Sequence, residues 1–478
     1  MRKKLILVII LSLLLCFFFP TGVLAFDNVE QGVGATREIM EYIYQHHINR
    51  PGVDTLSEGA IRGMIGTLND PYTEYLSPDN LKRFISSLDG EFSGIGIELE
   101  ARESYPVITR IVTNSPAAET GLCVGDQIVK VDGEDVAGQP LPCVVEKIRG
   151  PQDSLVKLTI ERASVGELNF EIRRAVIAGN SCEWRLLAGN VGYIYIYNFG
   201  KYTSKEFKVA LDELQKTGIK GLILDLRNDP GGYLQAAVDI AGYFLPPGKL
   251  VATTVDRDGA REEYKTTDHS TRYNLSTVVL INENSASAAE VLAGALADYK
   301  AATLVGTRSY GKGVVQAIVP LQAGGALKIT IASYLTPHGI SINKNGLLPE
   351  RIVSTPELQL FVARQLINST KTRRVMFALG GSGVFLDGEK ISESLTPFKL
   401  GDDFYLPLRF TFEAIGFEVK WRELTGDIAV TGRGQEFFFP LKGKDLFIKD
   451  EVTYLRTDFF NSMHVNIYHK KDNIILET

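Results

Sequence analysis

Apolar positions recur at two different spacings along this chain of 478 residues, and the spacing changes from one segment to the next. Over residues 36–48 and 56–68 they recur every three or four positions, which predicts two amphipathic helices. Two such helices cannot bury their apolar faces alone. We therefore expect this helical segment to pack on another domain or on a second subunit.

Short alternating runs replace the helical spacing between residues 91 and 163. They predict strands, one of them over residues 92–99, with short helices at 115–121 and 142–148 between them. The stretch therefore predicts a compact module of mixed α and β structure.

Residues 170–370 form the largest predicted unit. Its buried-type strands, such as 221–226 and 277–281, are each followed by a polar turn and a helix. Strands that alternate with helices indicate a sheet with helical crossovers, in which sites gather where strands end and helices begin.

An internal repeat follows in residues 373–478. The pattern of residues 405–421 returns in residues 452–468. Each copy predicts a strand, a short helix and a second strand.

Length and composition indicate several globular domains, because 478 residues are too many for one core. A hydrophobic content of 45% and a charged content of 23% are ordinary for such proteins. The net charge of −6, with no basic stripe, argues against nucleic acid as a partner. Cysteine and histidine spacings are not those of a metal site, so we expect no metal and no cofactor.

The first residues predict an export signal. A positive segment at residues 2–4 precedes an apolar run at 5–19, and small residues allow cleavage after Ala25. The apolar run is short for a membrane span, although a retained anchor stays open as an alternative. A lipoprotein signal through Cys16 is disfavoured because Leu15 stands where a small residue is needed. We expect a bacterial protein that is secreted or anchored at the outer face of the membrane.

Three cysteines remain in the exported chain, Cys123, Cys143 and Cys182. Three thiols cannot all pair within one chain, and a bridge between Cys123 and Cys143 stays open. We expect all three to be half-buried small apolar side chains.

The stretch from Thr277 to Gln316 carries the strongest chemical signal. Ser287 is predicted at a strand-to-helix junction, where the first backbone N–H groups have no helical partner and the dipole favours negative charge. Farther along, Lys312 stands between two glycines, and the stretch contains no histidine. A hydroxyl beside free donors, with a lysine as the candidate base, indicates serine–lysine acyl transfer. Such a lysine accepts a proton only when it is neutral, a state that burial favours.

The module at residues 91–165 resembles a PDZ domain, because its glycine-rich turn is followed by the run from Ser115 to Asp126. The resemblance implies that Gly94, Ile95, Gly96 and Ile97 form a loop that binds a terminal carboxylate, beside a strand that pairs with the peptide.

The C-terminal repeat resembles the N-terminal-like domain of copper amine oxidases, an α+β module found as a stalk on secreted bacterial proteins. The resemblance implies no copper chemistry here, because no cluster of metal ligands is present. It implies a binding or spacing role, and we expect a cell-envelope ligand.

The order of the modules and of their motifs resembles the carboxyl-terminal processing peptidases over roughly residues 36 to 356. The motifs stand at 70–73, 90–96, 148–151, 225–232, 285–290, 311–316 and 334–337. The resemblance implies an exported serine endopeptidase with an α/β core of the crotonase/Clp-like fold and an inserted PDZ domain. Its partners would be the C-termini of polypeptides, and its N-terminal helices would form a homodimer.

Site residues carry over from this resemblance one by one. Ser287 aligns with the nucleophile, Lys312 with the general base, and Gln316 with a glutamine that orients the lysine. The oxyanion donors would be the backbone N–H groups of Ala288 and of Gly231 or Gly232. Arg149 matches an arginine that links the PDZ domain to the active site.

Several alternatives stay open at this stage. Ser285 is the rival nucleophile, and a serine–histidine hydrolase would use His269 or His338. A non-catalytic extracellular binding protein is the alternative function. The chain also departs from the family at Gln152 and Asp153, where a lysine and a glycine are usual.

The resulting domain plan covers the whole chain. It comprises a signal peptide (1–25), an N-terminal helical segment (26–90), a PDZ domain (91–165), the serine protease core (166–372) and the copper amine oxidase N-terminal-like domain (373–478).

Overall fold

The computed structural model describes residues 28–478, except 90, 103, 113–114, 164, 179, 269–271, 369–372, 380, 382, 394, 442–444, 464 and 471. The predicted export signal and His269 lie outside the described residues. The chain divides into two units, one made of residues up to Ser77 with Ala317–Thr330, the other of Pro78–Gln316 with Ile331–Thr478.

The first unit contains the two helices that the apolar spacing predicts, α2 (Val29–His46) and α3 (Val53–Gly66). Helix α2 begins earlier than predicted because the Asn28 side chain accepts a hydrogen bond from the Gln31 N–H at 3.0 Å and caps it. Neither helix has a buried residue. A short strand, β1 (Glu74–Leu76), pairs with the first half of β18 (Ala326–Leu335).

The predicted α+β module is present in the second unit, after α4 (Pro78–Leu88). Its sheet has the order β3-β4-β5-β7-β8, with β6 paired to β5. Ser115 caps α5, and Gly121 ends it in the left-handed region at φ 85°. The elements are β3 (Ile97–Glu100), β4 (Val107–Ile111), α5 (Pro116–Thr120), β5 (Gln127–Val131), β6 (Glu134–Asp135), α6 (Leu141–Ile148), β7 (Leu155–Arg162) and β8 (Gly166–Arg173).

One predicted strand of this module is wrong in its extent. Residues 92–99 do not form one strand, because Gly96 takes a positive φ of 84° and turns the chain. The first part becomes β2 (Glu91–Gly94), which pairs with β9 (Ala175–Ala178) instead of the module's sheet. Residues 97–99 of the predicted strand belong to β3.

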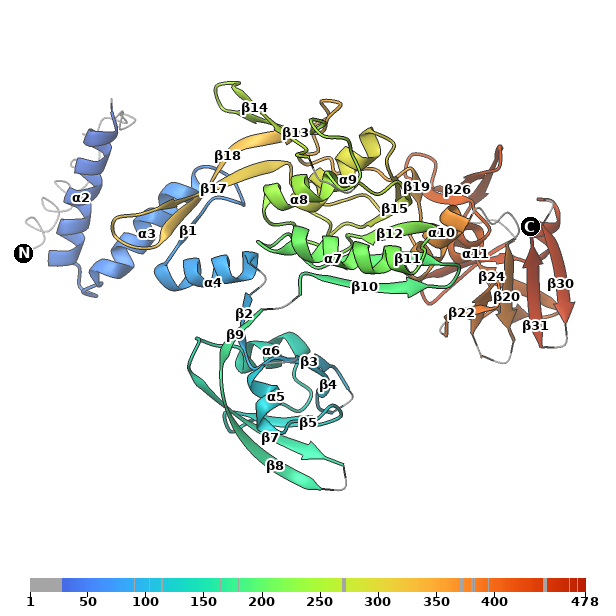
Figure 1. Cartoon of the computed structure of the whole chain (residues 1–478), viewed down its shortest axis with the longest axis horizontal. Helices are drawn as coiled ribbons and strands as arrows, with labels where there is room; N and C mark the ends of the chain where they lie inside the picture. The colour runs from blue at the N-terminus through green and yellow to red at the C-terminus, as the bar shows by residue number, and fades with distance from the viewer. Residues whose placement is uncertain are drawn as a thin grey trace, which may run out of the picture. The chain divides into compact units, whose positions relative to one another are not determined.

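A six-stranded sheet forms the core, in the order β10-β11-β12-β15-β16-β19 (Figure 1). All its neighbouring pairs are parallel except β10 with β11. This confirms the sheet with helical crossovers. The strands are β10 (Cys182–Leu187), β11 (Val191–Ile196), β12 (Gly221–Asp225), β15 (Ser276–Ile281), β16 (Thr303–Gly306) and β19 (Arg351–Ile352).

Both faces are covered in the middle of this sheet, so β12 is buried along its whole length, whereas the edge strand β10 is mostly exposed. On β12, Leu222 and Leu224 join the hydrophobic core formed with α7 (Thr203–Lys216), α8 (Leu234–Ala241) and α9 (Ala288–Asp298). Ile223, between them, joins a second core on the opposite face.

A second sheet has the order β1-β18-β13-β14, with β17 paired to β18. Its remaining strands are β13 (Leu250–Asp256), β14 (Arg261–Lys265) and β17 (Val314–Pro320). Strands β17 and β18 both cross the boundary between the two units.

The C-terminal repeat is present as predicted. One copy is β24 (Asp403–Pro407), α11 (Leu408–Ala414) and β25 (Glu418–Arg422), and β24 pairs with β29 of the other. The other elements are β20 (Arg374–Ala378), β21 (Val384–Leu386), β22 (Glu389–Ser392), β23 (Phe398–Leu400), β26 (Asp427–Gly432), β27 (Gln435–Pro440), β28 (Leu446–Lys449), β29 (Val452–Arg456), α12 (Asp458–Asn461), β30 (Asn466–Lys470) and β31 (Asn473–Glu477).

This C-terminal domain shares a hydrophobic core with the back of the six-stranded sheet. Helix α10 (Pro356–Asn368) contributes Phe361 to it, and the C-terminal domain contributes Phe377 and Phe412. Figure 1 shows α10 and α11 next to each other at this junction. The domain is therefore packed on the core.

The cysteines differ in part from the expectation. Cys123 and Cys143 are exposed free thiols, whereas Cys182 is buried. Burial raises the pKa of Cys182, so it is an inert apolar side chain. In the described part of the chain no group of His, Cys, Asp and Glu could hold a metal ion.

Candidate active site

Ser287 stands at the junction between β15 and α9, as its sequence context predicts. Its backbone has φ 56° and ψ −118°, a conformation that L-residues rarely adopt. Such a residue stores about 1–3 kcal/mol of strain, and strained residues of this kind cluster at active sites. The N–H of Ser287 donates to Glu290 Oε2 at 2.9 Å, which fixes the turn.

Glu290 connects the serine segment to the lysine segment. Its fully buried carboxylate also accepts hydrogen bonds from the Ser309 hydroxyl at 2.5 Å and from the N–H groups of Gly311 at 2.7 Å and Lys312 at 2.9 Å. Burial raises the pKa of Glu290, and these donors oppose that rise. The backbone N–H groups of Ser287 and Lys312 thus donate to the same carboxylate, which holds the two segments close together.

Tyr334 forms a second connection between the same segments. Its hydroxyl lies 2.7 Å from the Lys312 carbonyl oxygen and 3.1 Å from Ser287 Oγ. The side chain is buried, and the backbone N–H of Tyr334 donates to the Gly313 carbonyl at 3.1 Å. A phenol has one proton, so when Tyr334 donates to the carbonyl, the Ser287 hydroxyl donates to the phenol oxygen.

The turn that carries Gly231 and Gly232 lies directly against the serine. A Cβ built on Gly231 would lie 2.6 Å from the Ala286 oxygen, 2.7 Å from Ser287 Cβ and 2.8 Å from the Ala288 nitrogen. Both glycines have positive φ, 92° and 148°. The structure therefore brings the predicted oxyanion residues to the predicted nucleophile.

Asp229 fixes the conformation of this turn through two hydrogen bonds. It is fully buried, and its Oδ1 accepts the Gly231 N–H at 2.8 Å while its carbonyl accepts the Ala286 N–H at 2.9 Å. Burial raises the pKa of this carboxyl well above its usual range. Because the Gly231 N–H is already bonded to Asp229, the N–H groups of Gly232 and Ala288 are the better oxyanion candidates.

Lys312 and Gln316 lie at the start of the second sheet. Lys312 is half-buried in the segment before β17, and Gln316 is half-buried on β17 itself. A Cβ on Gly313 would lie 2.4 Å from the Asn343 nitrogen, so the glycine after the lysine allows close packing there.

The rival residues have other partners. Ser285 Oγ is fully buried, donates to the Leu226 carbonyl at 2.7 Å and accepts the Asn282 N–H at 2.9 Å. His338 is exposed and lies beside Asp298, with its Nδ1 3.4 Å from Oδ1 of that carboxylate. These contacts favour a structural role for Ser285 and place His338 at the surface, so neither is favoured as a catalytic residue.

The predicted carboxylate-binding loop, residues 94–97, connects β2 to β3 in the α+β module. The carbonyl of Ile95 accepts the Ala117 N–H at 2.8 Å, and that of Gly96 accepts the Val112 N–H at 2.9 Å. These bonds fix the loop conformation.

Arg149 lies beside this loop. A Cβ built on Gly94 would be 4.0 Å from Arg149 Cγ. The arginine that the resemblance assigns to the link between the PDZ domain and the active site is thus a neighbour of the predicted carboxylate-binding loop.

The sequence reasoning missed two residues, Glu290 and Tyr334. Glu290 stands three positions after Ser287, which is the spacing of a helix capping box, so a signal was present. Tyr334 opens the motif at 334–337, but its contact with Ser287 depends on the pairing of strands remote in sequence.

Comparisons with known proteins follow the same modular order. Family models match at residues 28–80 (Activating protease CtpB N-terminal domain), 107–162 (PDZ domain), 190–353 (Peptidase family S41) and 385–474 (Copper amine oxidase N-terminal domain).

Two curated relatives come from Bacillus subtilis. The chain is 36% identical to carboxy-terminal processing protease CtpB over 71% of both chains. It is 35% identical to carboxy-terminal processing protease CtpA over 66% of this chain and 68% of that protein. Among solved structures, a photosystem II D1 C-terminal processing protease is 29% identical, over 68% of this chain and 93% of that one, with a TM-score of 0.43.

Proposed function

Because the chain belongs to the carboxy-terminal processing proteases of peptidase family S41 and is a serine-type peptidase, we propose that it captures polypeptide C-termini through its PDZ domain and cleaves nearby with Ser287 and Lys312. One observation carries this proposal. Glu290 and Tyr334 gather a strained serine and the lysine segment into one hydrogen-bonded cluster against the Gly231 turn.

The proposed reaction proceeds through an acyl-enzyme. The neutral amine of Lys312, oriented by Gln316, takes the proton of the Ser287 hydroxyl as Oγ attacks the peptide carbonyl. The N–H groups of Ala288 and Gly232 stabilise the oxyanion. The C–N bond then breaks, and the Lys312 ammonium returns its proton to the leaving amine. Water, deprotonated by Lys312, hydrolyses the ester and frees Ser287.

Recognition of a free C-terminus is tested with two peptides of one sequence, apolar at the end, of which one carries a carboxylate and the other a carboxamide. A charge-assisted hydrogen bond contributes about 1.5–3 kcal/mol, so amidation should lower kcat/KM by about 13- to 160-fold. Cleavage is measured by mass spectrometry. Equal rates for both peptides would contradict carboxylate recognition.

The same pair of peptides tests the alternative of a non-catalytic binding protein. That alternative expects the carboxylate peptide to bind in a fluorescence anisotropy titration and expects neither peptide to be cut. Cleavage of the carboxylate peptide therefore excludes it.

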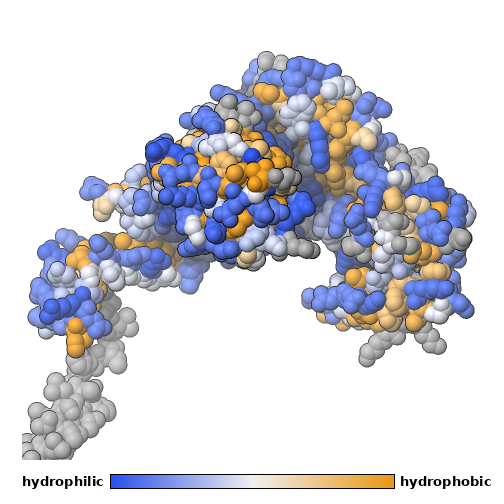
Figure 2. All heavy atoms as spheres, turned by 90° about the horizontal axis from the view of Figure 1, so that it is seen from below, coloured by the Kyte–Doolittle hydropathy of each residue, from blue (hydrophilic) through white to orange (hydrophobic). Residues whose placement is uncertain are grey.

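Dimerisation through the N-terminal helices is proposed from their exposed apolar side chains. Val33, Ile39, Tyr42 and Met64 are each 59–69% exposed, and Figure 2 shows hydrophobic atoms on this part of the surface. Large apolar side chains exposed together on two neighbouring helices are typical of an interaction site.

We expect light scattering after size exclusion to give twice the monomer mass for the exported chain. Ile39→Asp should give the monomer mass, because it would bury an unpaired charge in the interface. Glu58→Gln on α3 is the control and should stay dimeric. A monomeric parent chain, or a dimeric Ile39→Asp variant, would contradict this interface.

We propose export across the bacterial membrane from the positive and apolar pattern at the N-terminus. Among the described residues, no helix is long and apolar enough to span a membrane. The C-terminal domain would bind a ligand at the cell envelope.

A further inference from the structure

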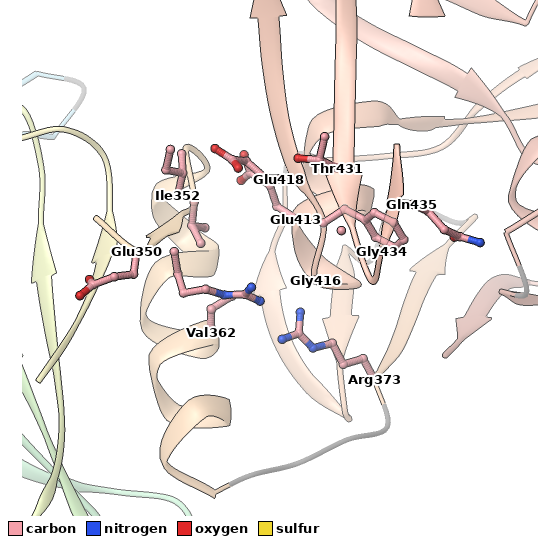
Figure 3. Close-up of a pocket in the computed structure, with 14 residues that line it drawn as sticks. Glu350, Ile352, Val362, Arg373, Glu413, Gly416, Glu418, Thr431, Gly434 and Gln435 are labelled. Carbon is pink, nitrogen blue, oxygen red and sulfur yellow. The ribbon is translucent and has the colours of Figure 1, made fainter. Parts of the chain in front are cut away.

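A cavity of about 400 Å³ opens between the peptidase core and the C-terminal domain (Figure 3). Strand β19 and helix α10 line it from the core side, and α11, β25, β26, the start of β27 and the residue before β20 line it from the other. Two arginines, Arg351 and Arg373, are among its lining residues, one from each side.

Arg373 is the most unusual side chain of this cavity, because its residue is only 8% exposed. Among the described residues, one hydrogen bond holds its guanidinium, from Nη1 to the Ala414 carbonyl at 3.1 Å. A Cβ built on Gly416 would lie 2.8 Å from Nη1, so the group lies directly on that glycine. Figure 3 shows it directed toward Gly416 and the middle of the cavity.

Arg373 has no carboxylate partner within the part of the chain that the structure describes. Its electrostatic neighbours include two further guanidinium groups, Arg351 and Arg433, and one carboxylate, Asp387. Burial, together with the repulsion between the guanidinium groups, lowers the pKa of Arg373 to about 10, and Asp387 offsets this only in part. A buried charge without a close partner destabilises the folded chain.

A purely structural role explains only part of this arrangement. Arg373 and Arg433 donate to the carbonyls of Ala414 and Ile415, at the C-terminal end of α11, where the helix dipole favours cations. That role uses one of the five N–H donors of Arg373. It does not explain Arg351, which reaches the same cavity from the peptidase core.

The glutamates that line the cavity already have partners. Glu350 accepts the Leu304 N–H at 2.7 Å. Glu418 Oε1 lies 2.6 Å from Lys420 Nζ, which balances its charge, although the geometry of this ion pair is not that of a hydrogen bond. Glu413 accepts two backbone N–H groups, those of Ser354 at 3.1 Å and Thr355 at 2.9 Å. In Figure 3 the carboxylates of Glu413 and Glu418 lie on the side of the cavity away from Arg373.

These acidic groups limit the charge that the cavity accepts. A multiply charged phosphate would be repelled by them, whereas a single carboxylate matches the planar fork of a guanidinium. We propose that the cavity binds a small ligand through a carboxylate that accepts hydrogen bonds from Arg373 and Arg351. The site is separate from the proposed peptidase machinery and joins the core to the C-terminal domain.

The test is thermal unfolding of the exported chain in increasing sodium acetate, with chloride replaced so that ionic strength and pH stay constant. Binding to the folded state raises Tm with ligand concentration. We expect acetate to raise the Tm of the parent chain and to leave that of Arg373→Met unchanged. Arg374→Met is the matched control, because that arginine is exposed and lies 3.2 Å from Glu477. It should respond as the parent does.

A second variant, Arg351→Met, and a second anion, inorganic phosphate, test the same cavity. Arg351→Met changes an exposed side chain, so it should fold, and it should weaken the acetate response at least about tenfold in concentration. Inorganic phosphate, used instead of acetate, should stabilise the parent less. An unresponsive parent, an acetate response that persists in Arg373→Met or Arg351→Met, or a stronger response to phosphate would overturn the proposal. Cleavage of an unfolded protein by Arg351→Met in chloride should match the parent rate, whatever the outcome for the peptidase mechanism.

Discussion

Lys312→Met is expected to lower kcat for peptide hydrolysis by about 10²–10⁴-fold, the range typical of a lost general base. Methionine keeps the length and apolar stem of lysine but cannot accept the proton of Ser287. Ser287→Ala should be at least as inactive, because no acyl-enzyme can form. Both variants are assayed on an unfolded protein at neutral pH, with fragments quantified by mass spectrometry.

Tyr334→Phe is the matched control for this pair. It removes one hydroxyl that contacts Ser287 Oγ and the Lys312 carbonyl, without removing the nucleophile or the base. A hydrogen bond contributes about 0.5–1.5 kcal/mol, so kcat should fall only about 2- to 13-fold. Cleavage at the parent rate by Lys312→Met or by Ser287→Ala would overturn the assignment of the dyad.

Gly231→Ala is expected to reduce kcat by about 10²–10³-fold, comparable to the loss of an oxyanion donor. The new methyl group would lie within 2.8 Å of the Ala286 oxygen, Ser287 Cβ and the Ala288 nitrogen. Either the turn or the start of α9 has to move, and the Ala288 N–H moves with it. The positive φ of 92° adds backbone strain.

Gly218→Ala is the control for Gly231→Ala. It introduces backbone strain at a positive φ but no steric contact with the serine segment. Gly218 also has a positive φ, 72°, but a Cβ there would meet no atom within 4 Å. This variant should lose about 1–2 kcal/mol of stability, the cost of a Cβ in the left-handed region, while keeping the parent kcat. Equal kcat values for Gly231→Ala and the parent would show that the turn does not serve the oxyanion.

The sequence predicted those features that depend on local chemistry. The strand, polar turn and helix around Ser287, and the capped helix that begins after Ser115, follow from residues close together in the chain. The internal repeat at 373–478 also predicted its own strands and helices, because both copies carry the same pattern.

Features that depend on tertiary pairing could not be predicted in this way. Tyr334 reaches Ser287 from a strand of a different sheet, and Asp229 occupies the N–H of Gly231 through a bond visible only in three dimensions. The packing of α10 against the C-terminal domain is of the same kind. The domain boundaries stay predictions, as do the roles of all the proposed site residues, from Ser287 and Lys312 to Gln316 and Arg149.

The C-terminal domain shares a hydrophobic core with α10 and is therefore part of the folded unit that contains the peptidase core. Val191, Ile223 and Val278 of the peptidase sheet belong to the same cluster as Phe377 and Phe412. Shortening the chain at residue 372 would leave the back of the catalytic sheet partly uncovered and prone to self-association. The two domains should therefore unfold in one cooperative transition. A substitution that destabilises either domain should lower the Tm of both.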